Sequence, residues 1–234
     1  MVKRKIIPLA VIMMLLAGCG NKEINQNPQE ENQAVVTTPE FTTDDALSLF
    51  SIDEDIPENV LETMIGKSLP NREFAEELSF LTVSYIDFDG ETQVGNLVVN
   101  KEVAKEVLDI FKDIYKAEFP IEKMELVDMY DADDNKSMLA NNTSAFNYRT
   151  IAGTSTISNH GKGLAIDINP FINPHVINGK ANPSEAQDYA DRSGDTAGLI
   201  KEGGAVYEAF TSRGWSWGGH WDNPNYQHFE KVIN

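Results

Sequence analysis

Hydrophobic positions recur with two different periods through the middle of the chain. Residues 78–100 form two runs rich in β-branched and aromatic residues, joined by the turn-forming stretch DFDGE at 87–91. This pattern predicts a β-hairpin. The next run, 101–120, repeats its apolar residues at helical spacing and ends at Pro120. We expect a helix whose apolar stripe faces the core. The stripe consists of Val103, Val107, Ile110, Phe111 and Ile114.

Shorter patterns lie on both sides of this central region. Residues 57–66 predict a helix that starts at Pro57 and stops at Gly66, and residues 204–214 predict another that stops at Gly214. Residues 123–130 are expected to form a short strand, and 131–142 a polar loop. Because no repeat and no βαβ alternation is visible, the fold class is α+β, with an antiparallel sheet and flanking helices.

Three aspartates in the polar loop raise the question of calcium binding. Asp131, Asp133 and Asp134 are closely spaced. Their spacing lacks the glycine and the distal glutamate of an EF-hand loop. We therefore interpret the segment as a solvated loop.

The N-terminus is typical of an export signal. Lys3, Arg4 and Lys5 precede an apolar run from Ile6 to Ala17, which is short for a membrane span. The following residues resemble a bacterial lipobox that ends at Cys19, the single cysteine of the chain. We predict a signal peptide over 1–18 and lipidation of Cys19; an ordinary cleaved signal or an uncleaved anchor are the alternatives. The protein would then lie outside the cytoplasm, anchored to the cell membrane by its lipid, and no disulfide could form.

The composition indicates three segments in the part of the chain that is predicted to be exported. Residues 19–43 are polar with few large apolar side chains and predict a disordered acidic tether. An N-terminal helical extension is expected over 44–77, and a compact domain over 78–234. Removing Lys3, Arg4 and Lys5 leaves 16 basic against 37 acidic residues, a net charge of −21. Such a surface repels nucleic acid, so no nucleic-acid partner is expected. We expect a monomer.

Two separated segments carry candidate metal ligands. His160 and Asp167 flank Gly161-Lys162-Gly163, a turn signal that would let them meet across adjacent strands. Asp167 lies in the apolar run LAIDI, where a buried carboxylate is costly unless it is paired or bound to a metal. Satisfaction by backbone donors is the alternative. His228 lies in the strand-like run YQHFE. Two histidines and one carboxylate make a common open zinc site.

At this point several motifs, in order, resemble one family. The run Ser158-x-His160-x-x-Gly163-x-Ala165-x-Asp167, then INPFINP, then GW.WGG.W....YQHFE is similar to the VanY-type zinc carboxypeptidases. These are D-alanyl-D-alanine carboxypeptidases and related L,D-peptidases of the bacterial cell wall. The likeness covers roughly 78–231. It implies the zinc D,D-carboxypeptidase (hedgehog/D,D-peptidase-like) fold, Zn²⁺ as cofactor, and a peptidoglycan stem peptide or its precursor as substrate.

The resemblance also implies roles for individual residues. His160, Asp167 and His228 match the zinc ligands. Arg149 matches an arginine that holds a carboxylate or polarises the scissile carbonyl, and Ser158, placed on the same strand face as His160, matches a substrate-contacting serine. A surface arginine and a plain strand serine are the alternatives.

One part of the pattern is missing. The family places an acidic general base three residues before the last histidine, where this chain has Asn225, and an acid after Trp-Gly-Gly, where it has His220. A neutral amide cannot accept a proton at a useful pH. Asp222 or His220 could replace the base, Asn225 could be an inactivating substitution, or the domain could be a zinc-dependent binder that no longer hydrolyses peptides.

The remaining candidates receive structural interpretations. We interpret Glu230 as structural or as a partner of a ligand, and we assign no role to His175. The tryptophans Trp215, Trp217 and Trp221 are expected to wall the cleft and to pack the closing strand.

Overall fold

A computed structural model describes residues 42–151 and 153–233. The predictions for the signal peptide, for Cys19 and for nearly all of the tether lie outside these residues. Among the helices that are described, none is both long enough and apolar enough to cross a membrane.

The predicted hairpin is confirmed and forms most of the first sheet. Strand β2 (Leu78–Ile86) pairs antiparallel with β3 (Thr92–Asn100), and β1 (Ser51–Asp53) adds to the other edge of β2. The turn is held by Asp87, whose Oδ1 accepts from the backbone N–H groups of Asp89 and Glu91 at 3.0 and 2.9 Å. This local turn chemistry explains why the hairpin can be recognised in the sequence.

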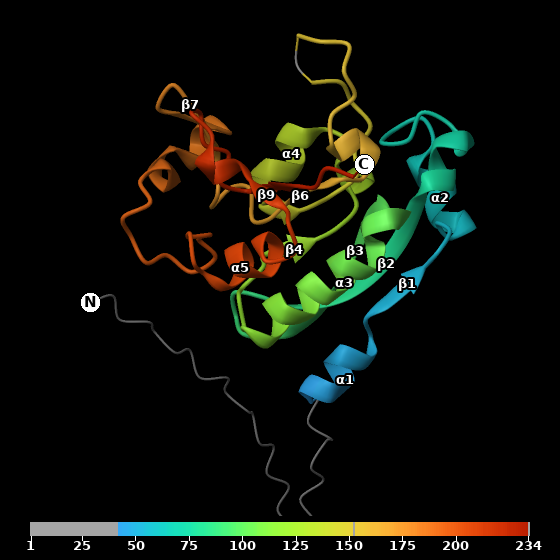
Figure 1. The fold of residues 1–234 in the computed structure, drawn as a ribbon, viewed down its shortest axis with the longest axis horizontal. Coiled ribbons are helices and arrows are strands. Elements are labelled where there is room, and N and C mark those ends of the chain that lie inside the picture. Colours follow the sequence, from blue (N-terminus) through green and yellow to red (C-terminus); the bar gives the residue numbers. More distant parts are fainter. Residues whose placement is uncertain (1–41, 152, 234) are drawn as a thin grey trace, which may run out of the picture. The chain divides into compact units, whose positions relative to one another are not determined.

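Helix α3 (Lys101–Lys116) follows the hairpin directly and lies along its inner face (Figure 1). The Asn100 side chain caps it by accepting from the Glu102 N–H at 3.0 Å. The predicted stripe is buried, as shown by Ile110, which has no exposed surface. Each such side chain stabilises the fold by about 1.5–3 kcal/mol relative to full exposure.

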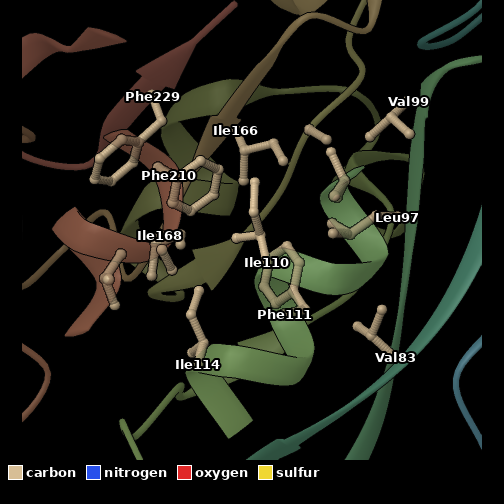
Figure 2. Close-up of a cluster of buried hydrophobic side chains, with 14 of the residues drawn as sticks. Val83, Leu97, Val99, Ile110, Phe111, Ile114, Ile166, Ile168, Phe210 and Phe229 are labelled. Carbon is tan, nitrogen blue, oxygen red and sulfur yellow. The ribbon is translucent and has the colours of Figure 1, made fainter. Parts of the chain in front are cut away.

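The second sheet lies on the other side of α3. Its order is β6 (Ala165–Asp167), β10 (His228–Glu230), β9 (Ser216–Trp217), all antiparallel. Figure 2 shows Phe229 of β10 and Phe210 of α5 (Ala205–Thr211) facing the α3 side chains across one core. Their rings stack with centroids 4.2 Å apart. The core therefore joins both sheets and fixes the central strand β10.

Shorter elements complete the described residues. The remaining α-helices are α1 (Thr43–Ser48), α2 (Glu58–Met64) and α4 (Asp134–Leu139). The 3₁₀ helices are η1 (Arg72–Glu77), η2 (Val127–Tyr130), η3 (His160–Lys162), η4 (Ser184–Ala190) and η5 (Gly218–His220). Strand β4 (Lys123–Met124) pairs parallel with β5 (Asn142–Thr143), and β7 (His175–Ile177) pairs antiparallel with β8 (Lys180–Asn182). The α+β class and the helices predicted over 57–66 and 204–214 are confirmed.

Two local predictions are wrong. The strand expected over 123–130 ends after Met124 and continues as η2, because the buried Asp128 turns toward Ser68 and accepts from its N–H and its hydroxyl at 3.2 and 2.8 Å. The polar loop 131–142 contains α4, which Asp133 caps by accepting from the Lys136 N–H at 3.1 Å. In residues 123–130, tertiary contacts decide the structure against the local strand pattern. In residues 131–142, the polar composition gave no sign of the short capped helix.

Candidate metal centre

His160 lies in a 3₁₀ turn, not on a strand adjacent to that of Asp167 as the sequence suggested. The Ser158 hydroxyl accepts from the Gly161 N–H at 3.1 Å, which closes the turn locally. Gly163 ends it with φ +70°, and a Cβ there would lie 2.5 Å from the backbone nitrogen of Asn100. Only glycine fits both the backbone angle and the close approach to β3. The turn signal is therefore correct, and the turn ends in contact with β3, where the Asn100 N–H donates to the Gly163 carbonyl at 2.9 Å.

Asp167 and His228 are brought together by strand register. They are Cα partners in the β6–β10 pair, so their side chains project from the same face of the second sheet. His228 Nδ1 lies 2.9 Å from Asp167 Oδ1, and His160 Nε2 lies 3.2 Å from Asp167 Oδ2 and 3.2 Å from His228 Nδ1. All three residues are buried, and this group could hold a metal ion.

The donor set and its spacing suit zinc. Two ligand atoms about 2.0–2.1 Å from a tetrahedral zinc stand roughly 3.3 Å apart. The two imidazole nitrogens lie 3.2 Å apart, close to this edge length, and each contacts a different oxygen of the Asp167 carboxylate. Two imidazole nitrogens and a carboxylate would also leave one tetrahedral position open, as catalytic zinc sites do.

Each imidazole contacts an oxygen atom through its second ring nitrogen. His160 Nδ1 lies 2.6 Å from the Ala145 carbonyl oxygen, and His228 Nε2 lies 3.1 Å from Glu230 Oε2. The Asn159 amide donates to the same Glu230 oxygen at 2.8 Å. Each ring can therefore donate its outer N–H to an oxygen and direct its other nitrogen toward the metal position.

Charge is balanced within the group when no metal is bound. Burial by itself lowers the pKa of His228, but hydrogen bonds with Asp167 and Glu230 prevail and raise that pKa to about 9. Burial opposes ionisation of Asp167 too, yet the imidazoles of His160 and His228 hold the pKa of its carboxyl well below the usual range. An imidazolium thus stands where a metal cation would bind, so metal must displace a proton.

Arg149 lies beside the His160 turn. Its backbone carbonyl accepts from the Ser158 N–H at 2.9 Å, and its Nη2 forms an ion pair with Asp134 Oδ2 at 2.6 Å. Nη1 of Arg149 is buried and has no hydrogen-bond partner among the described residues. Asp134 therefore holds one side of the guanidinium, and the Ser158 hydroxyl is engaged by the turn.

The three candidates for proton transfer are placed differently. His220 packs edge-on against Tyr207 and Trp217, with its Nε2 3.7 Å from Glu202 Oε1. Asp222 is exposed. Asn225 accepts from the His228 N–H through its backbone carbonyl at 3.2 Å. Of the three, Asn225 is therefore the one bonded directly to a candidate ligand residue.

The three tryptophans differ in how far their side chains are buried. Trp215 and Trp217 are buried, and their indole N–H groups donate to Glu106 and to the Tyr226 carbonyl. Trp221 is 40% exposed and its ring lies 5.3 Å from that of His228, measured between centroids. Trp221 is therefore the one that borders the candidate site.

A family model described as D-alanyl-D-alanine carboxypeptidase matches residues 152–231. No curated protein and no solved structure matches the chain. The match supports a relationship to this peptidase family and a hydrolase of the carboxypeptidase kind. It spans His160, Asp167 and His228 but stops short of Arg149.

The sequence pattern missed two contributors. The Ala145 carbonyl behind His160 carries no side-chain signal, so no motif could have identified it. His175, the first residue of β7, stands opposite Asn225 in an isolated antiparallel bridge. It received no role because nothing in the sequence indicates which distant residue it faces.

Proposed function

We propose that this chain is a zinc-dependent peptidase acting on the stem peptides of peptidoglycan, as a D-alanyl-D-alanine carboxypeptidase of the VanY type with the corresponding zinc D,D-carboxypeptidase fold. The buried group His160, Asp167 and His228, with zinc-like spacing inside the region matched by the peptidase family model, carries the proposal. Lipidation of Cys19 would place the enzyme at the outer face of the membrane, near this substrate.

The residues of the site would have separate roles in binding the metal ion and binding the substrate. His160, Asp167 and His228 would hold the ion, which when bound would polarise the scissile carbonyl and lower the pKa of water. Arg149 would bind the terminal carboxylate of the peptide, since a guanidinium suits carboxylate geometry. Asp134 holds the same guanidinium at 2.6 Å, which fixes its orientation before substrate arrives.

An open pocket of about 400 Å³ lies beside the turn that carries His160. Its lining includes Ile157, Gly161 and Lys162 from around that turn, together with Phe74 and Phe146. None of the three candidate ligands lines it. Its position next to the turn suits the part of a peptide chain that precedes the scissile bond.

A specific observation favours a second candidate function. Asn225 occupies the position of the family's base, and its Oδ1 is buried without a partner among the described residues. A neutral amide can retain geometry without taking a proton. The alternative is a metal-retaining protein that binds cell-wall peptides without cutting them.

The direct test is incubation of the purified chain with zinc and a stem pentapeptide, followed by measurement of free D-Ala. The proposed function predicts release that stops when zinc is chelated. No release by the wild type, together with release by Asn225→Asp, would support the binding protein instead.

The ligand set is tested by metal analysis alone. His160→Ala and His228→Ala should each abolish stoichiometric zinc, whereas Glu208→Gln, an exposed change on α5, should retain it. Full zinc retention in either histidine variant would contradict the ligand assignment.

A further inference from the structure

His175 is the first residue of β7 and pairs with Asn225 in an antiparallel bridge. The Val176 N–H donates to the Pro224 carbonyl at 2.8 Å, and the Tyr226 N–H donates to the Pro174 carbonyl at 3.4 Å. These two bonds join the residues on either side of the pair, and neither of them joins His175 to Asn225. His175 and Asn225 therefore form a non-hydrogen-bonded pair, in which Cα atoms lie about 4.5 Å apart and the side chains lie on one face.

This pairing places an imidazole beside the position where the family has its base. Asn225 is connected to the metal centre through its carbonyl, which accepts from the His228 N–H at 3.2 Å. The Asn225 side chain contributes no titratable group. Among the histidines outside the candidate ligand set, His175 is the one that is paired with this segment.

The charges of the centre act on His175. Burial is the main cause that lowers the pKa of its imidazole. A backbone hydrogen bond with Asn223 and the negative charge of Asp167 act in the opposite direction, and the charge of His228 lowers the pKa again. The groups around it on β8 and on the facing segment, Asn182 and Asn225, are neutral amides. Its ring is thus neutral at physiological pH.

A neutral imidazole carries one N–H, and its other nitrogen keeps a free lone pair. This is the protonation state that a general base needs.

We propose that His175 is the proton carrier of the reaction and replaces the carboxylate missing at position 225. This inference rests on the proposed peptidase function. As the oxygen of the attacking water bonds to the scissile carbonyl carbon, the imidazole of His175 accepts a proton from that water. The imidazolium then gives the proton to the leaving amide nitrogen while the C–N bond breaks. The products are a carboxylic acid and a free amine, which exchange a second proton to become a carboxylate and an ammonium group, and no other reactant is needed.

His220 and Asp222 compete for this role. The side chain of His220 is half exposed and lies near Glu202 of the loop before α5. Asp222 is exposed. Neither has a backbone pairing that fixes it beside Asn225, which is the advantage of His175.

The pairing is tested first, without metal or substrate. In the double variant His175→Cys and Asn225→Cys, peptide mapping should find a disulfide, because the expected Cα separation falls within the range of about 4.4–6.8 Å that disulfides span. The control replaces His175 and Pro224, whose side chain points to the opposite face. A disulfide in the control, or none in the test pair, would overturn the juxtaposition.

Catalysis is tested by the release of D-Ala from the pentapeptide. His175→Ala should lower kcat by roughly 10²–10⁴-fold with KM and zinc content retained, and adding Asn225→Asp to it should restore activity. Ile177→Ala, an exposed change on the same strand, is the matched control. Rescue by the carboxylate distinguishes a proton carrier from a merely structural histidine.

The outcomes separate this inference from the proposed function. If the wild type is active and His175→Ala is equally active, or if His220→Ala or Asp222→Ala abolishes kcat instead, the role of His175 is overturned and the peptidase stands. Activity only after Asn225→Asp would likewise overturn it. If neither the wild type nor Asn225→Asp releases D-Ala, the proposed function itself fails, and the role of His175 fails with it.

Discussion

Glu230 offers the sharpest test of how the metal centre is built. Its Oε2 lies 3.1 Å from His228 Nε2, and by accepting the outer N–H of that ring the carboxylate would make it a stronger metal ligand. Removing such a partner typically lowers metal affinity by about 10–100-fold. The Glu230 side chain is 24% exposed, and glutamine keeps an oxygen that can accept the same bond. We therefore expect Glu230→Gln to weaken zinc binding by about tenfold, or about 1.4 kcal/mol.

The assay is competition with a chromophoric zinc chelator at fixed pH, which needs no substrate. Glu208→Gln removes the same charge from an exposed position on α5 and serves as the control. Glu230→Ala should weaken binding further, toward 100-fold, because no acceptor remains. Equal zinc affinity in Glu230→Gln and Glu208→Gln, within twofold, would refute the idea that Glu230 orients His228.

Four further results are expected. In the metal-free protein the pKa of His228 is raised to about 9, so zinc affinity should increase about tenfold per pH unit up to that value, as one proton is displaced; a pH-independent affinity would contradict this. The same raised pKa stabilises the metal-free fold fully below 6.5, and this contribution should disappear as the pH rises through about 9, lowering Tm. Phe229→Ala should destabilise the protein by about 3–5 kcal/mol in denaturant unfolding, since the ring is fully buried against Phe210. Gly163→Ala should cost more than about 1 kcal/mol by the same measurement, because of its positive φ and its contact with Asn100.

The parts of the fold that the sequence predicted are those with local signals. The hairpin and α3 follow from period, turn chemistry and the Asn100 cap, all within a few neighbouring residues. Asp167 and His228 were identified because a carboxylate in an apolar strand and a histidine in an aromatic run are costly or unusual. Their actual meeting depends on register between β6 and β10, which no local pattern encodes.

What the sequence did not predict depends on distant contacts. The η2 turn in place of a strand results from the hydrogen bonds between Asp128 and Ser68. The pairing of His175 with Asn225 occurs in an isolated bridge without periodicity. The ion pair of Arg149 with Asp134 likewise joins a loop to a helix that composition had concealed.

The central place of β10 in the second sheet has a consequence for when the metal centre can form. This strand supplies His228, separates β6 from β9, and lies at the end of a long stretch of chain after Asp167. While the chain is being completed from its N-terminus, β6 and β9 have no strand between them, and His160 and Asp167 lack their third partner. The complete group of three residues that could hold a metal ion therefore forms only after residues 228–230 have been added and β10 has paired with β6.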